Sequence, residues 1–202
     1  MKLKTILLIF INCSIVSMAT SQNNMIENRI NTKLGLSFYP PLSNADNRTA
    51  NFRIETNYGV LKFLEAGAYL GYSRVKTIEP IINSVRHIRY THSPFYGITA
   101  NFHILPFFFK KNNFRFDYYL TGKLGGNYYF TTEGAFPEQG HHSEYAVGMG
   151  GAFYPWKHLG LFVEYCYGKY SYYGYPPGTF LDNLQSNLRF GFTYKFRKNT
   201  KY

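Results

Sequence analysis

The chain has 202 residues, a formal net charge of +11, and 20 tyrosines and 19 phenylalanines against one tryptophan. Only 16% of its residues are charged, below the roughly one quarter that is usual in globular domains. This composition excludes a disordered chain and argues against a helical bundle, whereas abundant Tyr, Phe and Gly are typical of one all-β domain with many strands.

The first residues have the pattern of a secretory signal peptide. Lys2 and Lys4 precede an apolar run, and small residues then lead to a cleavage site after Ser21. An uncleaved membrane anchor is the alternative, but the apolar run is too short to span a bilayer comfortably. We therefore expect residues 1–21 to be removed and residues 22–202 to form one domain. The net charge then falls from +11 to +9, because two lysines and no acids are lost.

Eight later segments alternate apolar with polar or small residues. This period of two predicts strands with two different faces. The expected strands are residues 31–39, 52–59, 64–73, 95–104, 114–130, 143–154, 159–170 and 187–196. The last segment is the clearest, since its apolar face carries Leu188, Phe190, Phe192, Tyr194 and Phe196.

The connections between these segments alternate in length. Residues 60–63, 106–113 and 155–158 are short turns, and the long connections are residues 40–51, 74–94, 131–142 and 171–186. An even number of strands with short turns at one end and long loops at the other predicts an eight-stranded antiparallel transmembrane up-and-down β-barrel. Both ends of the barrel segment then lie on the periplasmic side, and residues 197–202 form a short tail. The first strand must pair with the last, because an open edge is not tolerated in lipid.

The polar face decides between a membrane barrel and a soluble one. A soluble, secreted carrier would turn its apolar face inward to bind an apolar ligand, and its outer face would be rich in long solvated side chains. Here the polar face is rich in Gly, Ala, Ser, Thr and Asn, which suits a narrow lumen. The other face is almost free of charge, which suits lipid. We expect the membrane barrel and keep the soluble barrel as an alternative.

The polar face also carries a nearly balanced set of charges. Its predicted members are the cations Lys33, Arg53, Arg115, Lys123, Arg189 and Lys195 and the acids Glu55, Glu65, Asp117, Glu144 and Glu164. Such balance is expected in a narrow interior, because a lone buried charge is costly. We therefore predict a lumen charge network that plugs the barrel, rather than a wide pore.

Three segments resemble a known family. Residues 58–72, 160–170 and 189–196 are similar in pattern to the small outer-membrane β-barrel superfamily that includes OmpX and the OmpA transmembrane domain, with an aromatic style most like members from Bacteroidota. The resemblance implies a bacterial outer-membrane location, contact with outer-membrane lipid and lipopolysaccharide, and an aromatic assembly signal at Phe196 that is read by the barrel-assembly machinery. We expect a monomer without a nucleic-acid partner, since export removes the chain from nucleic acid.

One short motif suggests catalysis. His141 and Ser143 have outward parity and resemble the His-x-Ser pair of PagL-type lipid A acyl hydrolases, in which His is the base and Ser the nucleophile. The family has Asn after the Ser, whereas Glu144 stands here with inward parity, and Glu164 is distant and also inward. We expect no catalysis, and the hydrolase stays an alternative.

The remaining candidates concern ions and surface ligands. The histidines at positions 87, 92, 103, 141 and 142 have no regular spacing, and Cys166 lacks the partners of a zinc site, so neither metal nor cofactor is expected. Arg74, Lys76, Arg86 and Arg89 make the second long connection basic, which fits either contact with lipopolysaccharide phosphates or simple solvation. The fourth, rich in tyrosine, is either a binding surface or an aromatic girdle. The expected role is structural, or interaction through the long loops.

Overall fold

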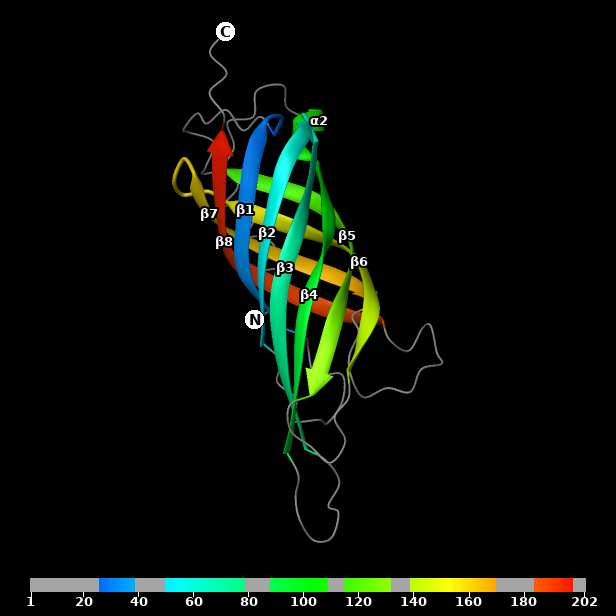
Figure 1. Ribbon diagram of the computed structural model, residues 1–202. Helices are drawn as coiled ribbons and strands as arrows, with labels where there is room; N and C mark the ends of the chain where they lie inside the picture. Colours follow the sequence, from blue (N-terminus) through cyan, green and yellow to red (C-terminus); the bar gives the residue numbers. More distant parts are fainter. Residues whose placement is uncertain are drawn as a thin grey trace, which may run out of the picture.

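Eight antiparallel strands close into a barrel in the computed structural model (Figure 1). The strands are β1 Arg29–Phe38, β2 Ala50–Leu61, β3 Leu64–Ile78, β4 Ile88–His103, β5 Phe116–Thr131, β6 Gln139–Phe153, β7 Leu159–Lys169 and β8 Leu184–Arg197. One helical turn, α2 Leu105–Phe108, lies between β4 and β5. The structure describes residues 26–38, 50–78, 88–108, 115–131, 139–169 and 184–197. The predicted fold class is confirmed.

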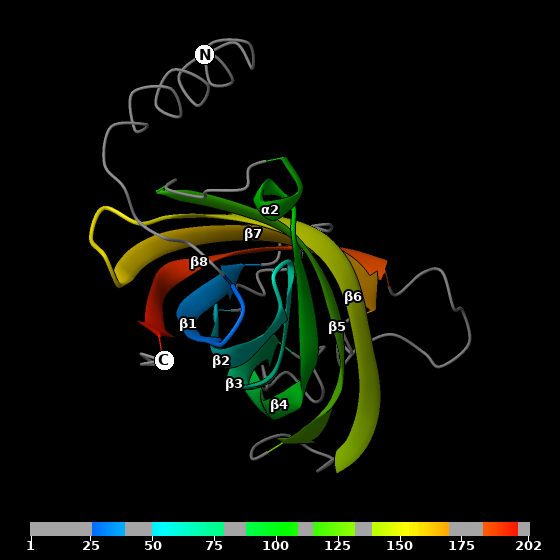
Figure 2. The ribbon, with the colours of Figure 1, turned by 90° about the horizontal axis from the view of Figure 1, so that it is seen from above.

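The seam between the first and the last strand closes the ring, as the view along the barrel shows (Figure 2). β1 and β8 pair from Arg29 opposite Arg197 to Phe38 opposite Leu188. Inside the barrel, the Thr193 hydroxyl donates to Asn31 Oδ1 across the seam at 2.6 Å. Every strand therefore has two neighbours, which satisfies the backbone as a lipid environment requires.

Strands β3, β4, β5 and β6 extend past the end of the barrel to which the long connections attach (Figure 1). We call this end the loop end. β3 continues to Ile78 and β4 begins at Ile88, whereas residues 74–94 were predicted to be one loop. That prediction was wrong because the register continues from Arg74 opposite His92 to Ile78 opposite Ile88, although the sequence there is mostly polar. β5 and β6 also pair beyond the last residues of β7. The result is a projecting wall of β3 to β6.

The apolar side chains face outward. Ile98, Leu124 and Val147 are 60–67% exposed, and the outward residues of the other strands are similarly apolar. The inward residues are mostly polar or charged and are buried. The alternative of a soluble barrel with an apolar lumen is therefore wrong, because the two faces are the other way round. An outward apolar band of this kind suits lipid and would promote aggregation in water.

Inward aromatic rings lie over inward glycines. The ring of Tyr69 lies so close to Gly97 and Gly125 that a Cβ atom at either position would come within 2.5 Å of it. In the same way Phe95 covers Gly71, and Phe162 covers Gly35. Large rings fit into this eight-stranded lumen because the glycines beneath them have no side chain.

Aromatic side chains gather at the opposite end, which we call the turn end. The rings of Phe63, Phe102 and Phe107 lie 5.0–5.5 Å apart between centroids, and Phe108 of α2 is 73% exposed. Such a cluster is typical of the interface between lipid and water. In the described ranges no helix is both long and apolar enough to cross a membrane.

Candidate functional site

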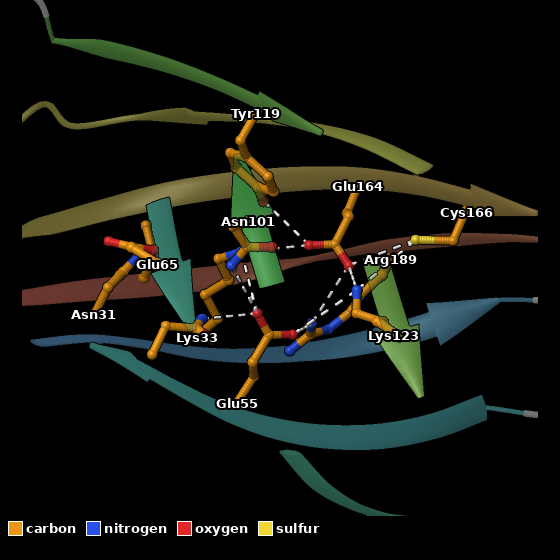
Figure 3. Close-up of polar contacts among 12 residues, drawn as sticks. Asn31, Lys33, Glu55, Glu65, Asn101, Tyr119, Lys123, Glu164, Cys166 and Arg189 are labelled. Carbon is orange, nitrogen blue, oxygen red and sulfur yellow. Dashed lines mark hydrogen bonds and ion pairs between the residues drawn. The ribbon is translucent and has the colours of Figure 1, made fainter. Parts of the chain in front are cut away.

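The middle of the lumen holds an ion cluster built around two carboxylates from opposite parts of the sheet (Figure 3). Arg189 Nη1 lies 2.6 Å from Glu55 and 3.6 Å from Glu164. Lys33 Nζ lies 3.2 Å from Glu55 and 3.4 Å from Glu164. Lys123 also pairs with both, at 3.8 Å from Glu55 and in closer contact with Glu164. This central cluster is completely buried, so its charges are compensated by one another.

Neutral donors complete the coordination of the two carboxylates. Asn57 and Asn101 donate to Glu55 Oε1 at 2.9 and 3.4 Å, and the Tyr119 hydroxyl donates to Glu164 Oε2 at 3.1 Å. These bonds matter because a buried charge needs its remaining lone pairs satisfied as well as an opposite charge. The central cluster therefore fills the lumen with fixed groups from β1, β2, β4, β5, β7 and β8.

A second cluster lies in the lumen near the turn end. Arg29 donates to Glu65 at 2.6 Å and to Asp117 at 3.1 Å. His103 lies between the same two carboxylates, with Nδ1 2.7 Å from Asp117 and Nε2 3.3 Å from Glu65. Asn31 also donates to Glu65, at 3.3 Å. We call this group the turn-end cluster.

Two members of the turn-end cluster were missed from the sequence. Arg29 lies before the first expected strand, residues 31–39, although it continues the parity of Asn31 and Lys33. His103 was counted among scattered histidines, although it shares the face of Asn101. Extending the alternation of the first expected strand by one residue pair would have found Arg29. His103 already lay within the expected strand 95–104, on the inward face, but was not counted among the lumen charges.

The other four predicted lumen charges lie outside these two clusters, and two of them lie against aromatic rings. The Arg53 guanidinium lies 4.5 Å from the centroid of Tyr69, and Lys195 Nζ lies 3.3 Å from the centroid of Tyr154. Burial raises the pKa of Tyr154, in the turn after β6, to about 12, so its phenol stays neutral. Glu144 is buried toward the loop end, and Arg115, just before β5, is half-buried.

The candidate catalytic pair lies on the outer face of the projecting wall. His141 and Ser143 are exposed, and His141 Nε2 is hydrogen bonded to the Tyr96 hydroxyl at 2.6 Å. Glu144 and Glu164 are both buried inside the barrel. On the strands that the structure describes, no carboxylate points outward, so this part of the chain offers His141 no orienting acid.

The predicted basic loop is divided by the structure. Arg74 and Lys76 lie on β3 and Arg89 lies on β4, so they belong to strands; Arg86 lies outside the described residues, as does the tyrosine-rich fourth connection. Arg74 is exposed, and its guanidinium lies 4.2 Å from the Tyr90 ring.

The remaining predicted positions are a metal site and the assembly signal. Within the described ranges, no three side chains of His, Cys, Asp or Glu are placed to hold a metal ion. Phe196 points outward on β8 opposite Ile30, with its ring 4.4 Å from that of Tyr194. Its role in assembly stays a prediction.

Comparisons with known proteins show the fold class. No family model and no curated protein matches the chain. The structure is similar to the N-terminal β-barrel domain of Pseudomonas aeruginosa OprF, with 12% identity, a TM-score of 0.55, and coverage of 84% of this chain and 98% of that one. Neisserial surface protein A gives 15% identity, a TM-score of 0.52, and 83% and 96% coverage. Ail of Yersinia pestis, in complex with the heparin analogue sucrose octasulfate, gives 16% identity, a TM-score of 0.51, and coverage of 84% of this chain and 99% of that one.

These similarities agree with the outward apolar band. The chain has the closed eight-stranded barrel fold of these proteins, as the sequence resemblance predicted. A further structure of this fold is the outer membrane protein OprG from Pseudomonas aeruginosa, with 11% identity, a TM-score of 0.50, and coverage of 87% of this chain and 99% of that one. The origin in Bacteroidota stays a prediction.

Proposed function

We propose that this chain is a non-catalytic outer-membrane barrel whose role is structural or is surface interaction through its loop end. The observation that carries the proposal is the projecting wall of β3 to β6, which stands on a barrel whose lumen is occupied by paired charges. The sides of such a barrel face lipid and its lumen is filled, so the surface accessible to a partner lies at the projecting end. The strand ends that the long connections join lie at the same end, and loops commonly carry binding residues.

Two further features support interaction with anionic partners. The mature chain carries a predicted charge of +9, and the charges of the lumen clusters largely cancel, so the excess lies elsewhere. Ail, a barrel of the same fold, was crystallised with a heparin analogue. For the present chain, lipopolysaccharide or another polyanion at the cell surface is the partner that this charge favours.

The proposal includes the route to the membrane. Residues 1–21 are removed as a signal peptide, the barrel-assembly machinery reads Phe196, and the barrel is a monomer with the loop end outside the cell. Sarkosyl insolubility, heat-modifiable gel migration and the mass of the mature chain test these points together. A chain recovered soluble without detergent, or one that keeps residues 1–21, would contradict them.

The surface role is tested by capture of envelope and surface components on the purified barrel. We would compare the wild type with a variant in which residues 79–87 are replaced by Asn-Gly, a turn that joins paired strands. The control replaces residues 109–114 at the turn end in the same way. Partners retained by the wild type and the control, and lost from the first variant, are expected. Equal capture by all three proteins would count against a role for the projecting wall.

A further inference from the structure

The outer face of the projecting wall changes character where the apolar band ends. Tyr72 on β3 and Tyr96 on β4 are the last large outward residues of the band and are 43% and 48% exposed. Beyond them, toward the loop end, the outward positions carry Arg74 and His92. We call the outward side chains of this zone the rim patch, and its members are Tyr72, Arg74, Tyr90, His92, Tyr96 and His141.

Each nitrogen-bearing side chain of the rim patch is held by a tyrosine of the patch. The Arg74 guanidinium lies 4.2 Å from the Tyr90 ring. The Tyr72 hydroxyl is hydrogen bonded to Nδ1 of His92.

His141 is held in the same way, by the Tyr96 hydroxyl at Nε2. When that hydroxyl donates, the proton of the neutral imidazole is on Nδ1, which becomes a donor to a ligand. Donors fixed in this way lose little conformational entropy on binding.

The charge around the rim patch has one sign. The strand carboxylates Glu55, Glu65, Asp117, Glu144 and Glu164 are all 0–6% exposed and lie in the lumen. In the described part of the chain, no carboxylate therefore faces Arg74 from the outer surface. On the described strands the acids lie in the lumen, and Arg74 is the cation that faces outward in the rim patch.

The position of the rim patch relative to the membrane indicates which anion it would meet. The apolar band of an outer-membrane barrel is about 25 Å tall, and its upper limit lies at the level of the outer-leaflet headgroups. We propose that the rim patch binds the phosphorylated sugar headgroup of an outer-leaflet glycolipid. Arg74 pairs with a phosphate, for which a guanidinium is well suited, while His141 and the tyrosine hydroxyls bond the sugar. This proposal rests on the proposed membrane orientation and names one partner of the surface role.

The test uses the full mature chain in nanodiscs of phosphatidylcholine doped with diphosphoryl lipid A or with lipid A from which both phosphates have been removed. The lipid A retained per barrel is counted by native mass spectrometry. The wild type is expected to retain the phosphorylated form preferentially. Arg74→Gln is expected to lower that retention about five-fold, the size typical of one basic residue at an anionic surface. Adding His141→Gln lowers it further.

The matched control is Lys62→Gln, which removes one exposed positive charge from the turn end. It should retain lipid A like the wild type, and heat-modifiable migration verifies that every variant is folded. Equal retention of both lipids by the wild type, or equal loss in Arg74→Gln and Lys62→Gln, would overturn the proposal. These nanodiscs contain no surface partner, so failure here removes the lipid site alone, whereas failed capture with intact lipid retention removes the wider surface role.

Discussion

The lumen clusters and the rim patch use similar side chains but compensate their charges differently. In the lumen, Glu55 and Glu164 each lie within 4 Å of three cations. At the rim, Arg74 lies against an aromatic ring and remains exposed. A buried cation needs a fixed anion because it cannot reach water, whereas an exposed one is solvated until a ligand arrives. The lumen charges therefore hold the barrel together, while the charge at the rim is available for binding.

Removing one lumen carboxylate should have the largest effect on stability. Glu55→Gln leaves three cations with one carboxylate in the central cluster, and we expect a loss of about 3–5 kcal/mol in the free energy of unfolding, since a buried pair is broken from one side. Urea titration of the folded fraction, read by gel migration, measures it. The control is Glu144→Gln, a buried position outside the two clusters, and should cost less. Similar losses at the two positions would show that burial alone, and not the ion cluster, sets the cost.

Filling a glycine beneath a lumen ring should have the next largest effect. A Cβ atom at Gly97 would lie 2.3 Å from the Leu124 carbonyl oxygen and 2.5 Å from the Tyr69 ring. We expect Gly97→Ala to cost about 1–3 kcal/mol by overpacking. Gly122→Ala is the control, because nothing lies within 4 Å of its Cβ position. The same urea titration compares the two variants. A Gly97→Ala protein with an unchanged free energy of unfolding would show that the barrel strands relax freely at this point.

The central cluster should also prevent a wide aqueous path. Fixed groups from several strands meet in the lumen, so we expect no large, stable openings in planar bilayers. Conductance of the purified barrel measures this directly. Long-lived, wide openings would contradict a plugged lumen and weaken the contrast between a closed interior and an available rim.

Removal of the candidate nucleophile is expected to have no effect on lipid A. Ser143→Ala should leave lipid A acylation unchanged, because the described outer surface supplies no acid to orient His141. Mass spectrometry of lipid A from cells with the wild type, with the variant and without the protein makes the comparison. Loss of an acyl chain only with the wild type would establish the hydrolase and make the rim patch part of an active site.

The period of two in the sequence was enough to predict the strand number, the closed topology and which face is inside. The strand ends were harder, because the residues from Arg74 to Thr77 and from Arg89 to His92 are mostly polar and still pair. The side chains that meet across neighbouring strands could not be predicted either. Tyr96 and His141 are 45 residues apart, and only the register through β5 brings them together.

The seam between β1 and β8 has a consequence for the timing of folding. The bond from Thr193 to Asn31 joins positions 162 residues apart, and the neighbouring backbone pairs span similar separations. Contacts of such long range form slowly, because the loop entropy is lost before they are gained. The ring can close only after the final strand has arrived, so until then two strand edges are exposed. For this chain, the slow step of assembly is expected to be the meeting of its two ends.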